Sequence, residues 1–295
     1  MDIRSGTIVV GLDDSASSKR ALTWATEQAV ADHRELTLVH TINAVTPAYL
    51  DAAVEDPQNA RAALLAQAEA LFTAARKDVA RTAPDLVVHE VFSFADPREQ
   101  LLELSKRAAL VVVGSRGRGK VRSLLLGSVG VALVRHSACP VVIHRPWNPG
   151  LVRNGIVVGA DGSEESRSVL EFAYHQAAVR NLPLTVLHCF PDGRAALGAS
   201  YVVNDPAEVF ESERLLLAES MAGLAEKHPD VMARTQLAGG LPEEQLVRRG
   251  DRMNLIVVGA HQSGNVTQML FGSVSIAVTE HATCPVAVVP LARVE

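Results

Sequence analysis

The stretch LVVVGSRGRGKVRSLLLGSVGVALVRHSACPVVI, residues 110–143, decides the fold of this chain. An apolar run of strand length ends in Gly114-Ser-Arg-Gly117, and nine residues later Gly127-Ser128 opens an apolar stretch at helical spacing. Glycines let the backbone approach a ligand and adopt positive φ. The first N–H groups of the following helix have no intrahelical partner and suit an anion, to which the Ser128 hydroxyl can add a hydrogen bond. The pattern therefore predicts a phosphate-binding loop in an α/β protein.

The same pattern recurs in altered form in LIVVGAHQSGNVTQMLFGSVSIAVTEHATCPVAV, residues 255–288. The first glycine is kept as Gly259 and the later pair as Gly272-Ser273, but Gln262 stands in place of the second glycine. Neither copy is a P-loop, which ends in Gly-Lys-Ser/Thr, and neither is Gly-x-Gly-x-x-Gly after a first strand.

The sequence contains two similar halves. TIVVGLDDSASSKRALTWATEQA at 7–29 matches GIVVGADGSEESRSVLEFAYHQA at 155–177, and LTLVH at 36–40 matches LTVLH at 184–188. The offset between matching positions changes only from 148 to 145 residues along the chain, so insertions are few. Such internal repetition indicates duplicated structural units. We expect a first domain at 1–146, a linker at 147–154 that contains proline and glycine, and a second domain at 155–295.

Each unit alternates apolar runs of strand length with helical patterns. In the first unit the expected strands are Thr7–Leu12, Leu36–His40, Leu86–Phe92, Leu110–Val113 and Pro140–His144. Either Ser15 or Ser17 can cap the helix that follows the first strand. Continuously apolar strands separated by helices indicate a parallel sheet that is covered on both faces. Right-handed crossovers then make it a doubly wound, Rossmann-like sheet.

Composition excludes several classes of protein. The chain has 295 residues, 48% of them apolar, with a net charge of −5 and 4% aromatic residues. Scarce aromatics and the absence of a long basic run argue against a nucleic-acid-binding surface. No apolar run reaches the roughly 18 residues that span a bilayer, and the N-terminus lacks the pattern of a signal peptide. Three cysteines without metal-ligand spacing predict buried thiols in a cytoplasmic protein, and we expect no metal site.

The motif Gly-x2-Gly-x9-Gly-Ser after the fourth strand, with Asp13 after the first, resembles the universal stress protein family, in particular its tandem two-domain members. The resemblance covers nearly the whole chain. It implies five parallel strands in the order 3-2-1-4-5 in each unit and a bound ATP, with Mg²⁺ left open. The adenosine would meet Asp13, Gly11 and Thr41. Carried over motif by motif, the ribose and phosphates would meet Val113, Gly114, Gly117, Gly127, Ser128 and Val129.

Charge distinguishes the two copies. The first loop carries Arg116, Arg118, Lys120 and Arg122 within seven residues, and we expect two of them, with Arg116 and Arg118 as the candidates, to contact phosphate. The second loop contains no Lys or Arg, and a glutamine forced to positive φ would cost on the order of 1 kcal/mol. The rest of the second pattern remains as Asp161, Gly259, Gly272, Ser273 and Val274. We therefore expect ATP mainly in the first unit.

The sequence thus predicts an ATP-binding stress-response regulator with little turnover, at most slow hydrolysis, and no assigned catalytic residue. ATP would order the Gly114–Leu126 loop and change the surface offered to a protein partner. In the family the fifth strand forms the dimer interface, so we expect the two units to pair and the chain to form a homodimer. Two alternatives stay open: an interaction module without nucleotide, and an adenylyl-transfer or ATP-pyrophosphatase-like enzyme. The enzyme is less favoured because Gly-Leu-Asp-Asp-Ser after the first strand lacks its paired glycines.

Overall fold

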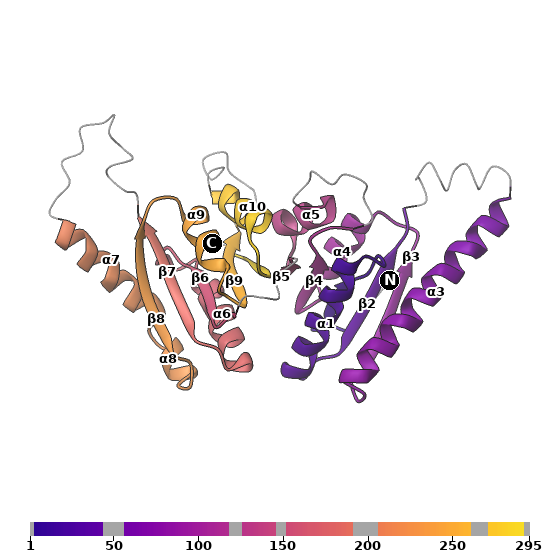
Figure 1. The fold of residues 1–295 in the computed structure, drawn as a ribbon, viewed down its shortest axis with the longest axis horizontal. Helices are drawn as coiled ribbons and strands as arrows, with labels where there is room; N and C mark the ends of the chain where they lie inside the picture. Colours follow the sequence, from indigo (N-terminus) through magenta and orange to yellow (C-terminus); the bar gives the residue numbers. More distant parts are fainter. Residues whose placement is uncertain are drawn as a thin grey trace. The chain divides into compact units, whose positions relative to one another are not determined.

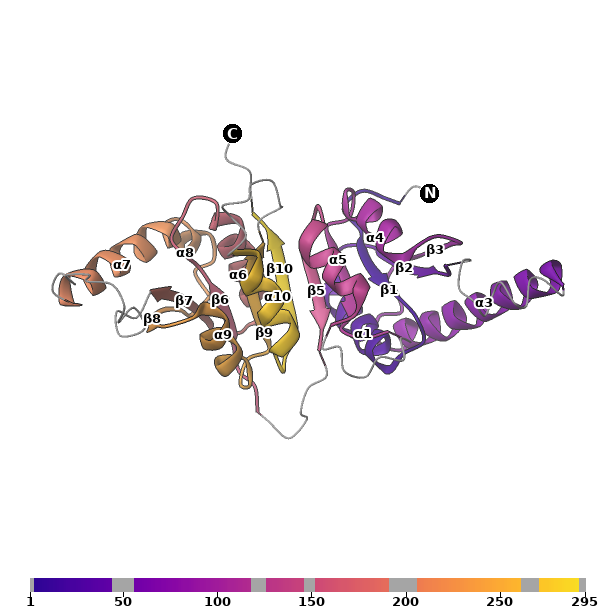
Figure 2. The same ribbon diagram turned by 90° about the horizontal axis from the view of Figure 1, so that it is seen from above.

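The computed structural model describes residues 3–43, 56–117, 126–145, 152–190, 206–260 and 271–291. The chain divides into two compact units, Met1–His144 and Arg145–Glu295. Each unit is a sheet with helices packed on its faces (Figure 1 and Figure 2). The predicted linker, 147–154, lies mostly outside the described residues. Within the described ranges, no helix combines the length and apolar character that a bilayer span requires.

The first unit alternates strands and helices as the sequence predicts. Its elements are β1 (Ile8–Gly11), α1 (Ala16–Ala31), β2 (Leu36–Thr41), α3 (Pro57–Thr82), β3 (Val88–Ser93), α4 (Pro97–Ser105), β4 (Leu110–Gly114), α5 (Ser128–His136) and β5 (Val141–His144). Among the described residues, the strands pair in parallel in the order β3-β2-β1-β4-β5. Ile8 of the central strand lies beside Leu36 on one side and Leu110 on the other.

The second unit repeats this arrangement with one added short helix in its described part. Its elements are β6 (Ile156–Gly159), α6 (Arg167–Arg180), β7 (Leu184–Phe190), α7 (Pro206–Met221), α8 (Leu224–Lys227), β8 (Ala233–Gly239), α9 (Pro242–Gly250), β9 (Leu255–Ala260), α10 (Phe271–His281) and β10 (Val286–Pro290). The described strands pair in parallel in the order β8-β7-β6-β9-β10. Each unit therefore has the predicted 3-2-1-4-5 order.

The core of each unit lies along its central strand. Ile8, Val9 and Val10 of β1 have 0% relative exposure, as do the matching residues 156–158 of β6. Both faces of these strands must be apolar because helices cover both, which is why the sequence shows an unbroken apolar run rather than alternation. The predicted α/β class with parallel sheets is confirmed.

The first helix of each unit starts differently. In α1, Ser15 is the N-cap and its Oγ accepts a hydrogen bond from the Ser18 N–H at 3.1 Å. Ser15, rather than Ser17, thus fills the role for which the sequence offered both. In the second unit α6 begins at Arg167, which matches Lys19 in the repeat, and it is preceded by a turn in which Ser163 Oγ accepts a hydrogen bond from the Ser166 N–H at 3.2 Å. Its N-cap, Ser166, makes no side-chain capping hydrogen bond.

Candidate nucleotide site

The carboxyl ends of three neighbouring strands meet at one edge of the first sheet. Gly11, Thr41 and Gly114 are the last residues of β1, β2 and β4, and β1 pairs with both of the other strands. Ligands of open parallel sheets bind in the crevice outside these carboxyl ends. Asp13 follows β1 by two residues and lies at the same edge.

A cavity of about 510 Å³ opens at this edge. It is lined by all ten predicted first-unit residues that the structure describes: Gly11, Asp13, Thr41, Val113, Gly114, Arg116, Gly117, Gly127, Ser128 and Val129. The predicted contact Arg118 lies outside the described residues, as do Lys120 and Arg122. The volume falls within the range of small-molecule sites, roughly 300–1,000 Å³.

The Asp13 carboxylate lies between the start of α1 and the glycine loop. Its Oδ1 accepts a hydrogen bond from the Ser15 N–H at 3.1 Å, while the Asp13 N–H donates to Ser18 Oγ at 3.4 Å. Its Oδ2 faces Gly117, since a Cβ built on Gly117 would lie 2.4 Å from that oxygen. Local hydrogen bonds thus hold a carboxylate at the cavity, where it can accept further hydrogen bonds from ligand hydroxyls.

Close approach, and not backbone conformation, explains the glycines at 114 and 117. The sequence predicted a use for positive φ in this loop, but neither Gly114 nor Gly117 has it. A Cβ on Gly114 would lie 2.5 Å from Ser17 Oγ and 2.8 Å from the Ser17 carbonyl carbon. Of the two uses that the sequence suggests for these glycines, close approach is therefore the one that applies here. Glycine is required because Ser17 and Asp13 pack directly against the loop.

Helix α5 directs its N-terminus at the cavity. Its N-cap Gly127 is extended, with φ −73° and ψ 159°, and has no side-chain capping hydrogen bond among the described residues. The Gly127 N–H donates to the Ser115 carbonyl oxygen at 3.0 Å, which ties the helix start to the end of β4. Ser128, Val129 and Gly130 line the cavity. The first-turn N–H groups and the positive end of the helix dipole make this end suitable for a phosphate.

Two polar side chains of the loop have opposite environments. Arg116 is exposed and lines the cavity, so its guanidinium can reach an anion there. Ser115 also lines the cavity but has 0% relative exposure, and its Oγ has no hydrogen-bond partner among the described residues. An unsatisfied buried hydroxyl costs about 1–3 kcal/mol.

Several lining residues were missed by reasoning from the sequence. They are Leu12, Ser18, Val39, Pro97, Leu101, Ser115 and Gly130. The repeat held a signal for three of them, because Ser18 recurs 148 residues later as Ser166, and Pro97 and Leu101 recur 145 residues later as Pro242 and Leu246. All three copies line the corresponding pocket of the second unit. No such recurrence marks Ser115, whose match is Ala260.

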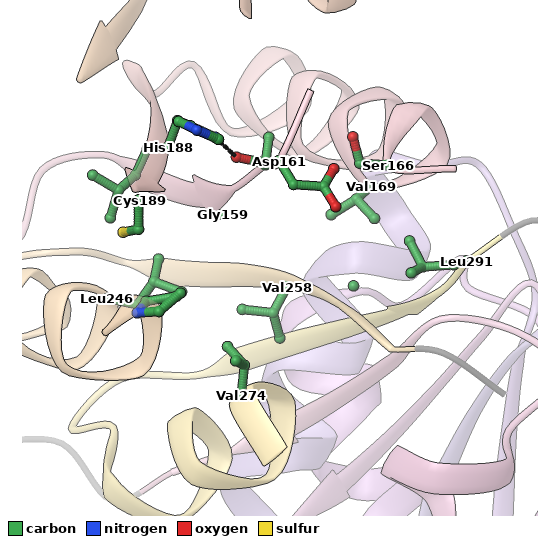
Figure 3. Close-up of a pocket in the computed structure, with 14 residues that line it drawn as sticks. Gly159, Asp161, Ser166, Val169, His188, Cys189, Leu246, Val258, Val274 and Leu291 are labelled. Carbon is green, nitrogen blue, oxygen red and sulfur yellow. Dashed lines mark hydrogen bonds between the residues drawn. The ribbon is translucent and has the colours of Figure 1, made fainter. Parts of the chain in front are cut away.

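The second unit has a smaller pocket at the corresponding edge (Figure 3). Its volume is about 160 Å³, and Asp161, Gly259 and Val274 are the predicted residues that line it. Gly272 and Ser273 lie in the first turn of α10, and Gln262 lies outside the described residues. The volume is below the lower end of the usual range for small-molecule sites, roughly 300 Å³.

Asp161 is held by its own loop. Its Oδ1 accepts hydrogen bonds from the Ser163 N–H at 2.9 Å and from Ser163 Oγ at 2.7 Å. Burial raises the pKa of Asp161, but the hydrogen bonds from Ser163 outweigh burial and the net pKa lies below its usual value. The side chain is therefore a carboxylate at neutral pH, as is required of a hydrogen-bond acceptor for a ligand.

A histidine joins the second pocket to α7. His188 Nδ1 lies 2.9 Å from the Ala160 carbonyl oxygen, and its Nε2 lies 2.9 Å from Glu213 Oε2. Carbonyl and carboxylate oxygens accept hydrogen bonds, and each ring nitrogen of His188 faces one of them. The matching histidine, His40, also lies by a carbonyl oxygen, that of Leu12 at 2.7 Å. However, the position 145 residues before Glu213 is an alanine.

Replacing Glu213 by alanine is expected to lower the free energy of unfolding by about 1–2 kcal/mol, because it removes a charged hydrogen-bond partner from a mostly buried imidazole. Glu211→Ala is the matched control on the same helix. Its side chain is 77% exposed and lies 3.7 Å from Arg214, so its loss should cost under roughly 0.5 kcal/mol. Urea unfolding of both variants at neutral pH measures the difference, and equal losses would show that the His188 pair contributes nothing.

Comparisons with known proteins agree with this architecture. The model of the universal stress protein family matches residues 5–145 and again 153–290. A universal stress protein of Mycolicibacterium smegmatis is 33% identical over 292 residues, which cover 96% of each chain. One of Mycobacterium tuberculosis strain H37Rv is 33% identical over 288 residues, which cover 95% of each.

Solved structures show the same fold. A crystal structure of a universal stress protein from Archaeoglobus fulgidus covers 99% of this chain and 98% of its own, with a TM-score of 0.64 at 20% identity. That similarity concerns the fold alone. The double match of the family model and the relatives of equal length go further: this chain belongs to the universal stress protein family, with two tandem copies of its domain.

Proposed function

We propose that the first unit binds ATP and that the protein is a stress-response regulator which uses the nucleotide as a switch, with little turnover. One observation carries this proposal: the ten described residues that the motif predicted all line one cavity at the carboxyl edge of the sheet. A chance set of residues spread from 11 to 129 would not converge in this way.

The polar and apolar walls of the cavity suit the parts of an adenine nucleotide. Val39 and Thr41 at the end of β2 would contact the adenine, and the Asp13 carboxylate would accept hydrogen bonds from the ribose hydroxyls. The glycine backbone and the α5 N-terminus would hold the phosphates. Arg116 would offset their charge, and Mg²⁺ would be held chiefly by phosphate oxygens.

Asn substitutions at two adjacent carboxylates test the proposal. Asp13→Asn should weaken ATP binding by roughly tenfold to a hundredfold, because a charged acceptor for ribose hydroxyls is lost. Asp14→Asn is the matched control: Asp14 is exposed, lies 3.3 Å from Lys19, and has a φ of 61° that asparagine tolerates. Calorimetric titration with ATP and Mg²⁺ measures both variants. Equal affinities would refute the role of Asp13, and no ATP binding by the wild type would favour an interaction module without nucleotide.

The switch itself would act on a protein partner. ATP would draw the described backbone 114–117 and the start of α5 together, and the altered surface around them would be read by that partner. Most of the predicted Gly114–Leu126 loop lies outside the described residues. Homodimer formation and a cytoplasmic location remain predictions, which size-exclusion chromatography with light scattering and cell fractionation can test.

A further inference from the structure

Leu291 contributes an apolar side chain to the wall of the pocket in the second unit. It follows β10, its N–H donates to the Ala260 carbonyl oxygen at 3.1 Å, and its side chain lines the pocket. A Cβ built on Gly259 would lie 2.8 Å from Leu291 Cδ2 and 3.1 Å from Val169 Cγ2. Figure 3 shows Leu291 beside Val169 at one end of the pocket, with Cys189 and Leu246 at the other.

The corresponding place in the first unit is taken by the helix that follows β1. There the matching glycine, Gly114, is packed against Ser17 in the first turn of α1. In the second unit α6 begins at Arg167, and the side chains closest to Gly259 are those of Leu291 and Val169. The preceding carbonyl, that of Pro290, accepts a hydrogen bond from Ser168 Oγ of α6 at 3.4 Å. The end of β10 and the residue after it therefore contact both the start of α6 and Gly259.

The two pockets differ in volume, as expected if Leu291 takes up space beside Gly259 where the first unit has Ser17 beside Gly114. The first has about 510 Å³ and the second about 160 Å³, although both lie at the same edge of a repeated sheet. An apolar side chain against Gly259 also offers nothing to a ribose or phosphate oxygen. Residues 260–271 contain no Lys or Arg that could compensate.

We propose that Leu291 determines the ligand range of the second unit: its side chain occupies the glycine end of the pocket and excludes adenine nucleosides and nucleotides from it. The inference rests on the proposed function in taking the first unit as the nucleotide site. The lack of Lys and Arg in the second glycine loop was the earlier explanation for weak nucleotide binding by the second unit. The present proposal assigns the exclusion instead to the Leu291 side chain, which follows β10.

Cys189 provides a reporter that is specific to the second pocket. It lines that pocket and is half-buried, whereas Cys139 and Cys284 are 7% and 0% exposed. Burial raises the pKa of Cys189 to about 11, so alkylation by iodoacetamide is slow and its rate can be followed by mass spectrometry of the peptide. Adenosine is the probe, because it carries no phosphate and needs no cationic loop. ATP binding by the first unit is measured in parallel by equilibrium dialysis.

Leu291→Ala should admit adenosine, which at ten times its dissociation constant would slow alkylation of Cys189 roughly tenfold. Wild type and Leu291→Met, which keeps the side-chain volume, should show no protection. Leu291→Val removes less side-chain volume and should give partial protection of Cys189. This variant tests the role of Leu291 if the alanine variant does not fold.

Two results would overturn the proposal: protection of the wild type equal to that of Leu291→Ala, or no protection of a folded Leu291→Ala or Leu291→Val variant. Failure of the first unit to bind ATP would instead refute the proposed function. The Cys189 readout would still decide the role of Leu291, because it reports on the second pocket alone.

Discussion

Gly117→Ala is expected to lower the affinity of the first unit for ATP by roughly tenfold or more, at little cost in stability. The new Cβ would lie 2.4 Å from Asp13 Oδ2, so the carboxylate must move away from its place in the cavity. The clash is with the end of a flexible side chain, and Gly117 has no positive φ that alanine would strain. The free energy of unfolding should therefore change by less than about 1 kcal/mol. Calorimetric titration with ATP and urea unfolding measure the two effects separately.

A double-mutant cycle tests whether the loss of ATP affinity in Gly117→Ala comes from displacement of Asp13. If Gly117→Ala acts by displacing Asp13, then adding it to Asp13→Ala should cost almost no further affinity. Fully additive losses would show that the glycine acts directly on the ligand. Gly114→Ala offers a contrast, because its Cβ would meet the Ser17 backbone at 2.8 Å. That variant should lose on the order of 2 kcal/mol of stability, since a backbone cannot rotate away as a carboxylate can.

The sequence predicted the fold well because the signals were local and repeated. The apolar run 7–12 and its copy 155–160 indicated buried central strands, and the structure has β1 and β6 within them. The sequence left both Ser15 and Ser17 as possible N-caps of α1. The hydrogen bond from the Ser18 N–H to Ser15 Oγ identifies Ser15 as the cap. Strand order followed from the family resemblance, since apolar runs alone do not say which strands are neighbours.

The site was predictable where a motif named residues and unpredictable where packing decides. Spacing marked the glycines and the family resemblance marked Asp13, yet the reason for glycine at 117 is a contact with Asp13, 104 positions earlier in the chain. Ser115 is inside the motif but at a position that the motif leaves free. Leu291 carries no sequence signal, because a leucine after a strand is ordinary. Its position against Gly259 follows from the path of the chain beside the end of β9, where its N–H donates to the Ala260 carbonyl oxygen, and this is a property of the tertiary structure.

Raising the pH from 8 to 10.5 is expected to destabilise the fold strongly through two buried thiols. Burial raises the pKa of Cys139 to about 11 and that of Cys284 to about 12, with Ser137 partly offsetting the effect at Cys139. An unfolded cysteine ionises near pH 9. Between that pH and the folded pKa, only the unfolded chain loses the proton, so the free energy of unfolding falls as pH rises. At about 1.4 kcal/mol per pH unit, the two thiols together should cost roughly 4 kcal/mol by pH 10.5.

Comparison with Cys139→Ala/Cys284→Ala isolates this contribution. The cavities left by the two substitutions are the same at both pH values and cancel, and so do other groups that titrate in this range, including Tyr174, whose pKa burial also raises. Urea unfolding at pH 8 and pH 10.5 should therefore show a wild-type loss that exceeds the loss of the double variant by several kcal/mol. Cys189→Ala should remove roughly half as much of the loss as the double variant does, because burial raises the pKa of this one thiol to about 11 as well. Equal losses for wild type and the double variant would mean that the two thiols ionise in the folded chain as readily as in the unfolded one, and would refute the prediction.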